Sequence, residues 1–141
     1  MPKAYGGEFG TPAEYPYHSV ATPSTHDMSN IRLWWREDRK RTQRYYNDIL
    51  GLEGMAPVEC SAELCEQILR RQLSARSMLM IAPLQDWLAV DDSMRADNAT
   101  TERINDPSNP NQHWCYRMHL TLEELLSAES FNSKIKAIAR R

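Results

Sequence analysis

The sequence predicts an α/β fold made of consecutive βα units of a parallel sheet. Residues 17–23 are typical of a short buried strand, and residues 77–83 are apolar without alternation, as in a strand covered on both faces. Helical patterns separate these two stretches and also follow the second one. The order strand, helix, helix, strand, long loop, helix is that of two neighbouring units of a (β/α)8 barrel.

The first unit opens with residues 1–16, which are rich in Gly and Pro and predict a lead-in loop. A helix is expected to begin near Asn30, because several side-chain oxygens just before it can cap a first turn. Those candidate caps are Ser24, Thr25, Asp27 and Ser29. Apolar and aromatic residues then recur at helical spacing as far as Leu50, and Gly51 stands where a left-handed residue ends a helix. We expect one long helix with an aromatic buried face.

A second helix is predicted after Ser61, a capping residue, with Arg70 and Arg71 near the end where the helix dipole favours them. Its apolar stripe consists of Leu64, Cys65, Ile68, Leu69 and Leu73. Cys60 and Cys65 straddle the start of this helix at a spacing that matches no compact zinc signature. We therefore expect both to be buried thiols rather than metal ligands.

The second unit begins with the strand that Pro83 is expected to end. Residues 84–90 predict one or two helical turns, and residues 91–112 predict a polar loop without a pattern of its own. Thr121 and Glu124 match a capping box, and the helical pattern after them continues to the end of the chain. A loop as long as this one usually has a function.

Length and composition limit the function classes. The 141 residues suit one ordinary domain and fall short of the roughly 250 residues of a complete (β/α)8 barrel. A net charge of −2 and a pI near 6.1 exclude a general attraction to nucleic acid or acidic membranes. No apolar run has the length of a signal peptide core or a membrane span, and three cysteines do not form a disulfide framework, so a cytoplasmic location is expected. We expect one partial domain over residues 1–141, divided into 1–16, 17–75 and 76–141.

His26 and Asp27 form the most informative pair, because they follow the first predicted strand. The carboxyl ends of parallel strands are where α/β folds expose chemistry. A carboxylate there can stabilise a developing positive charge or hold sugar hydroxyls, and a neighbouring His can donate to a hydroxyl oxygen. The structural alternative is that Asp27 caps the following helix while His26 packs on Trp34 or Trp35.

Two other functions are open to the same region. Together with His113 or His119, the His-Asp pair could hold a divalent metal, although neither is spaced i, i+4 from the pair. The basic run over residues 36–44 could contact phosphates. Glu37 and Asp38 interrupt that run, and a solvated helix face explains it better.

The long loop carries a second set of candidate binding residues. Residues 102–110 and the nearby Trp114 combine amide, guanidinium and carboxylate groups with an aromatic face. Sugars are bound by this mixture, because their hydroxyls hydrogen-bond to planar polar groups while their C–H faces lie against rings. The alternative is a loop pinned by an internal pair between Arg103 and Asp106, with Trp114 buried.

Three motifs stand in one order over residues 15 to 141. They are Pro-Ser-Thr-His-Asp-Met-Ser-Asn-Ile-Arg-Leu-Trp-Trp at 23–35, Pro-Leu-Gln-Asp-Trp-Leu at 83–88, and Glu-Arg-Ile-Asn-Asp-Pro-Ser-Asn-Pro at 102–110 with Trp114, Tyr116 and Arg117. Together they resemble the C-terminal part of the 4-alpha-glucanotransferases. The resemblance is to the amylomaltase or disproportionating-enzyme family of the α-amylase superfamily.

This resemblance implies the C-terminal fragment of a (β/α)8 TIM barrel, with its last two strands and their helices. It implies retaining transfer of α-1,4-glucan segments by double displacement, through a covalent glucosyl-enzyme intermediate. The partners are an α-1,4-glucan or malto-oligosaccharide and a glucose or maltose acceptor, with no cofactor, metal, nucleic acid or membrane. Asp27 matches the Asp that stabilises the transition state by binding ring hydroxyls of the distorted glucose. His26 and Asn105 are expected to contact the same glucan.

Other residues in these motifs are expected to have supporting roles. Trp34 and Trp35 lie on the apolar stripe of the first helix and are expected to form the core behind the site. Arg103, Asp86 and Arg117 are expected to support the shape of the long loop.

No segment of the chain resembles the nucleophile or acid/base motifs of that family. The chain alone is therefore expected to be inactive, and the alternative function is a non-catalytic carbohydrate-binding or interaction module derived from such a barrel. A metal-dependent hydrolase comes third. Two strands out of eight would leave open sheet edges and an uncovered apolar face, so we expect weakly cooperative unfolding of the isolated chain.

Overall fold

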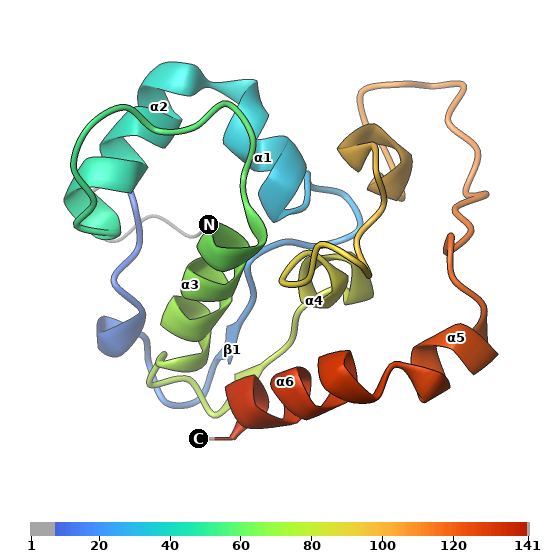
Figure 1. The fold of residues 1–141 in the computed structure, drawn as a ribbon. Coiled ribbons are helices and arrows are strands. Elements are labelled where there is room, and N and C mark those ends of the chain that lie inside the picture. The colour runs from blue at the N-terminus through green and yellow to red at the C-terminus, as the bar shows by residue number, and fades with distance from the viewer. Residues whose placement is uncertain (1–7, 141) are drawn as a thin grey trace.

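The computed structural model describes residues 8–140 (Figure 1). In this part of the chain two short strands form one parallel sheet. Strand β1 (Val20–Ala21) pairs with β2 (Leu79–Met80), and Val20 lies opposite Leu79. The parallel pairing is as the sequence predicts. The strands are shorter than the predicted 17–23 and 77–83, because only these residues find a ladder partner.

Two predictions are wrong for residues 8–140: that the first strand is buried, and that the second strand is covered on both faces. Val20 is 52 % exposed, Leu79 49 % and Ile81 59 %, whereas Ala21 is buried. The sheet has two strands in this part of the chain, so one row of apolar side chains has no further strand or helix over it. The open apolar face expected from a partial barrel is therefore present.

Helical elements cover just under half of residues 8–140. They are η1 (Pro12–Glu14), α1 (Ile31–Glu37), α2 (Arg39–Arg44), η2 (Tyr45–Ile49), α3 (Ala62–Leu73), α4 (Leu84–Leu88), η3 (Ala99–Glu102), α5 (Leu122–Ser127) and α6 (Glu129–Ala139). Residues 1–7 of the predicted lead-in loop lie outside the described residues, and 8–16 hold one short 3-10 turn.

The single long helix predicted up to Leu50 is wrong, because the chain breaks at Asp38. This residue has an extended backbone, with φ −138° and ψ 99°, and its side chain accepts hydrogen bonds from the amides of Lys40 and Arg41. It thus ends α1 and caps α2, as short acidic side chains do. The continuation η2 is π-helical and ends at Ile49. Gly51 follows two residues later, and its φ of 67° confirms the predicted left-handed residue.

The predicted caps of the later helices are confirmed. The Ser61 side chain accepts from the amide of Leu64 at the start of α3. Thr121 and Glu124 form the capping box of α5. The predicted C-terminal helix is in two parts, since Ala128, at ψ 66°, separates α5 from α6.

The core lies between α1, α3, α4 and α6. Its largest fully buried apolar side chains are Trp35, Tyr45, Ile68, Leu69, Leu88 and Val90. Helix α6 contributes Phe131 and Ile138, and Lys134 Nζ donates to the carbonyl of Val90 at 2.6 Å. Figure 1 shows α6 running beneath α3 and α4, which closes this side of the core.

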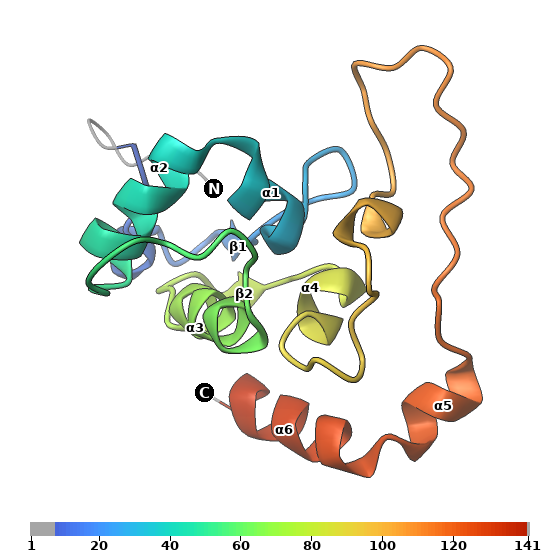
Figure 2. The same cartoon turned by 45° about the horizontal axis from the view of Figure 1, so that its top comes forward.

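The segment between η3 and α5 leaves this helical body as a long extended excursion (Figure 2). It carries Trp114 and returns at α5, whose Leu122 and Leu126 are 66 % and 80 % exposed. No helix among residues 8–140 combines the length and apolar character needed to cross a membrane.

Candidate functional site

His26 and Asp27 lie on the loop that joins β1 to α1, as the sequence predicts. Their side chains are 54 % and 50 % exposed, and His26 Nε2 is 3.3 Å from Asp27 Oδ2. Asp27 does not cap α1. That helix is capped by Asn30, whose side-chain oxygen accepts from the amide of Leu33 at 3.0 Å. The capping alternative for Asp27 is therefore wrong, and its carboxylate faces solvent.

Asn105 comes to the same place from the long loop. Its Nδ2 donates a 2.7 Å hydrogen bond to Asp27 Oδ1, and the residue is 8 % exposed. The three candidate site residues are thus brought together, although Asn105 is 78 positions from Asp27. Each oxygen of the carboxylate has one nearby polar group.

Trp114 lies over the other side of His26. The two ring centroids are 5.2 Å apart with the planes at 50°, and Trp114 is 65 % exposed. The alternative that Trp114 is buried is wrong. His26 packs on this ring rather than on Trp34 or Trp35.

A shallow hollow of about 420 Å³ opens beside this cluster. We call it the strand-end hollow. Its lining residues are Val20, Thr22, Ser24, Thr25, His26, Ile81, Ala82, Pro83 and Ile104. These residues come from the ends of both strands and from the long loop. His26 lines this hollow, and Asp27 is not among its lining residues.

A buried carboxylate fixes the loop that carries His26 and Asp27. Asp86 on α4 accepts from Ser24 Oγ at 2.6 Å and from the amide of Ile31 at 2.8 Å. Burial raises the pKa of Asp86 to about 6, against the lowering effect of these two hydrogen bonds. The expectation that Asp86 supports the long loop is wrong, because its hydrogen bonds go to residues at either end of the β1–α1 loop.

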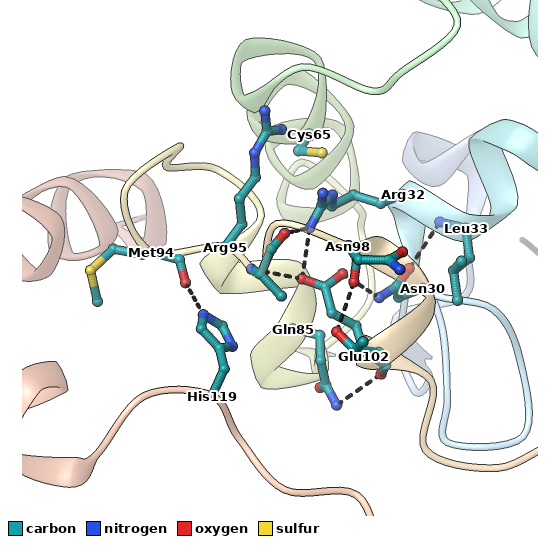
Figure 3. A network of polar contacts seen from close by, with 12 residues as sticks. Asn30, Arg32, Leu33, Cys65, Gln85, Met94, Arg95, Asn98, Glu102 and His119 are labelled. Atoms are coloured by element: carbon teal, nitrogen blue, oxygen red, sulfur yellow. Dashed lines mark hydrogen bonds and ion pairs between the residues drawn. The ribbon is translucent and has the colours of Figure 1, made fainter.

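Glu102, at the end of η3, is a second buried anchor (Figure 3). Its carboxylate accepts from Asn30 Nδ2 at 2.9 Å and from Arg32 Nη1 at 2.8 Å. The side chains of Arg32 and Glu102 are 8 % and 2 % exposed. This network joins the β1–α1 loop to the segment that leads to Asn105. This network was not predicted from the sequence, because its partners are far apart in the chain.

The other predicted supports have mixed outcomes. Arg103 and Asp106 form the predicted pair at 3.4 Å, and Arg103 Nε also donates to the carbonyl of Asn105. Trp35 is fully buried and Trp34 half-buried, in agreement with a role in the core. Arg117 is exposed.

The alternative of a divalent metal site has no support among the described residues. No group of three or more His, Cys, Asp and Glu side chains within residues 8–140 has the arrangement of a metal site. His119 Nε2 lies 3.0 Å from the carbonyl oxygen of Met94, and His113 is exposed.

Comparison with known proteins adds independent evidence. The sequence profile described as 4-alpha-glucanotransferase matches residues 1–122. The chain belongs to the 4-alpha-glucanotransferase family. It is 40 % identical over 138 residues to the 4-alpha-glucanotransferase DPE2 of Oryza sativa subsp. japonica, which covers 98 % of this chain. It is 33 % identical over 133 residues, 94 % of the chain, to a 4-alpha-glucanotransferase of Chlamydia caviae.

The chain spans only part of these family members, 15 % of the rice protein and 24 % of the Chlamydia caviae protein. Among solved structures it resembles the amylomaltase from Streptococcus agalactiae in complex with acarbose. The TM-score is 0.63 at 23 % identity, and the match covers 90 % of this chain and 22 % of the amylomaltase chain. This likeness shows a shared fold. The profile match over residues 1–122 confirms the predicted family.

Proposed function

We propose that the protein containing this chain is a 4-alpha-glucanotransferase that transfers α-1,4-glucan segments by retaining double displacement. Residues 1–141 would supply the last two strands of its (β/α)8 barrel, with their helices. The nucleophile and the acid/base would come from parts of the protein outside these residues. The donor is an α-1,4-glucan or malto-oligosaccharide, and the acceptor is glucose or maltose.

The observation that carries the proposal is the cluster of Asp27, His26 and Asn105 at the end of β1. A retaining glycosyl transfer passes through a transition state in which the sugar ring carries positive charge. A carboxylate already held in place stabilises that charge without reorganising at the moment of reaction. The 2.7 Å hydrogen bond from Asn105 supplies this positioning for Asp27.

His26 and Trp114 give the same site the features of a sugar-binding surface. The imidazole can donate to a sugar hydroxyl, while the exposed indole offers a flat apolar face for sugar C–H groups. The contact between the two rings, with centroids 5.2 Å apart, supports this proposal, and His26 also lines the strand-end hollow. We propose that His26, Asn105 and Trp114 contact the bound glucan.

The place of action that we propose is the cytoplasm. The three cysteines of the chain, Cys60, Cys65 and Cys115, are all free thiols, and thiols persist in reducing compartments.

The decisive variant is Asp27→Asn in the protein at its natural length. We expect kcat for glucan transfer to fall by at least ~10²-fold, while glucan binding measured by titration calorimetry persists. Asp48→Asn, a change at an exposed carboxylate on η2, is the matched control and should leave kcat unchanged. Near-normal turnover in Asp27→Asn would refute the proposed role. Glucan binding without any transfer by the natural protein would instead favour the carbohydrate-binding module.

A further inference from the structure

Two buried thiols face each other at the start of α3, away from the candidate site. Cys60 and Cys65 are 2 % and 0 % exposed, and their sulfur atoms are 3.5 Å apart. Cys65 Sγ also lies 4.0 Å from the carbonyl oxygen of Cys60. At this distance the Cys65 thiol donates a hydrogen bond to Cys60 Sγ, and no covalent bond joins the two sulfur atoms.

The backbone around Cys60 is irregular, whereas the backbone around Cys65 is helical. Cys60 precedes the capping residue Ser61 and belongs to the irregular stretch 51–60. Cys65 lies in the helix, where its backbone N–H donates a hydrogen bond to the carbonyl oxygen of Ser61. A disulfide needs a sulfur–sulfur distance of about 2.05 Å. Rotation of the Cys60 side chain and a small shift of its loop would supply the remaining approach, with α3 left in place.

Cys60 is one of the residues that line a polar hollow. We call it the arginine hollow; it has a volume of about 430 Å³ and is lined by Arg32, Arg36, Glu59, Cys60, Arg95, Asp97, Asn98 and Ala99. Arg95 Nη1 donates to the carbonyl of Cys60 at 3.0 Å, so a guanidinium stands beside this residue. A hollow of this size and polarity admits water and solutes as small as hydrogen peroxide.

We propose that Cys60 and Cys65 form a reversible disulfide when the protein meets hydrogen peroxide. The Cys60 sulfur attacks one peroxide oxygen, the O–O bond breaks, and Cys60 sulfenic acid and one water result. The Cys65 sulfur then attacks the Cys60 sulfur, the S–O bond breaks, and a second water leaves. Two thiols are oxidised and one peroxide is reduced to two waters. A dithiol reductant reverses the change.

The surroundings set the rate of this oxidation. The hydrogen bond with Cys65 and burial raise the pKa of the Cys60 thiol, and the guanidiniums of Arg95 and Arg32 act in the opposite direction. Since the thiolate is the nucleophile, the first step is slow. The second step is fast, because Cys65 is held against the sulfenic acid.

Peptide mass spectrometry tests the proposal on the natural-length protein. After peroxide treatment the protein is denatured, its free thiols are blocked with N-ethylmaleimide, and it is cleaved with trypsin. Both thiols fall in one peptide, Tyr45–Arg70, whereas exposed Cys115 falls in Ile104–Arg117. We expect Tyr45–Arg70 to lose two hydrogens and take no maleimide, and to take two maleimides after reduction with dithiothreitol.

Two variants define the controls. Cys65→Ser should leave Cys60 as a sulfenic acid that dimedone traps, and Cys115→Ser should leave the disulfide intact. If Cys65→Ser does not fold, the mass of the wild-type peptide still decides the question. Maleimide on both Cys60 and Cys65, after peroxide exposure that oxidises Cys115, would overturn the proposal. This result is independent of glucan transfer.

Discussion

Asn105 Nδ2 donates a 2.7 Å hydrogen bond to Asp27 Oδ1, while His26 Nε2 lies 3.3 Å from the other oxygen of the same carboxylate. The orientation of Asp27 is therefore controlled from two segments that are far apart in sequence. Asn105 is 8 % exposed, so the amide that holds Asp27 is itself held by the long loop. This relationship makes Asn105 a positioning residue for the proposed chemistry.

Replacing Asn105 by Ala removes the hydrogen bond to Asp27 without adding charge. A hydrogen bond to a charged group contributes about 1.5–3 kcal/mol, so we expect kcat for glucan transfer to fall by about 10- to 100-fold. Steady-state kinetics on the natural-length protein gives this value. Asn109→Ala, on an exposed part of the same loop, should leave kcat within about twofold. Unchanged kcat in Asn105→Ala would mean that Asp27 needs no positioning.

Replacing Trp114 by Ala removes the apolar ring beside His26. We expect KM for malto-oligosaccharides to rise by about 2- to 12-fold with kcat little changed, since a ring contact contributes about 0.5–1.5 kcal/mol. Trp114→Phe keeps a flat face and should retain most of the affinity. If both variants match wild type in KM, the indole does not contact the glucan.

The buried pair of Arg32 and Glu102 gives a stability prediction. Glu102→Ala leaves the Arg32 guanidinium buried without its carboxylate, which costs about 3–5 kcal/mol of the free energy of unfolding. Glu59→Ala breaks the exposed pair with Arg36 and should cost less than about 1 kcal/mol. Urea unfolding followed by circular dichroism compares the two. Equal costs would show that burial does not decide the strength of these pairs.

Asp86 predicts a pH dependence of stability. Its pKa is raised from 3.8 to about 6 in the folded protein, so the folded state holds this proton more tightly than the unfolded chain. The contribution of Asp86 is therefore fully present below about pH 4 and is lost as the pH rises through about 6. The loss is on the order of 3 kcal/mol.

Asp86→Asn tests this sign, because an amide can still accept from Ile31 and donate to Ser24. The free energy of unfolding of Asp86→Asn relative to wild type should increase by about 1–3 kcal/mol between pH 4 and pH 7. Asp106→Asn is the opposite control. A hydrogen bond from the Ser108 side chain lowers the pKa of Asp106, so its contribution is present above the unfolded pKa and is lost as the pH falls. A flat difference for Asp86→Asn contradicts the prediction.

Local sequence signals were sufficient for the helix ends that depend on neighbouring residues. The caps at Ser61 and Thr121 and the left-handed Gly51 are all found as predicted. The break at Asp38 had a signal too, since a short acidic side chain ahead of Lys40 and Arg41 is a capping pattern. The break was not predicted, because the apolar residues keep their helical spacing across Asp38. The covering of the strands could not be inferred locally, because it depends on which other segments lie against the sheet.

In the candidate site too, features that depend on neighbouring residues could be predicted, and features that depend on distant partners could not. His26 and Asp27 follow a strand and could be singled out by position, and Asn105 was found through the motif around it. The buried roles of Asp86 and Glu102 could not be predicted, because they depend on partners such as Ser24 and Arg32, which lie 62 and 70 positions away.

Glu102 has a consequence that extends beyond stability. Its carboxylate grips Asn30 and Arg32 just after the Asp27 loop, and only two residues separate it from Asn105. Glu102 therefore helps to position both segments that meet in the Asp27–Asn105 contact. We expect a substitution at Glu102 to misalign both partners at once and so to change the turnover of the proposed glucan transfer, although Glu102 is buried away from the proposed glucan site.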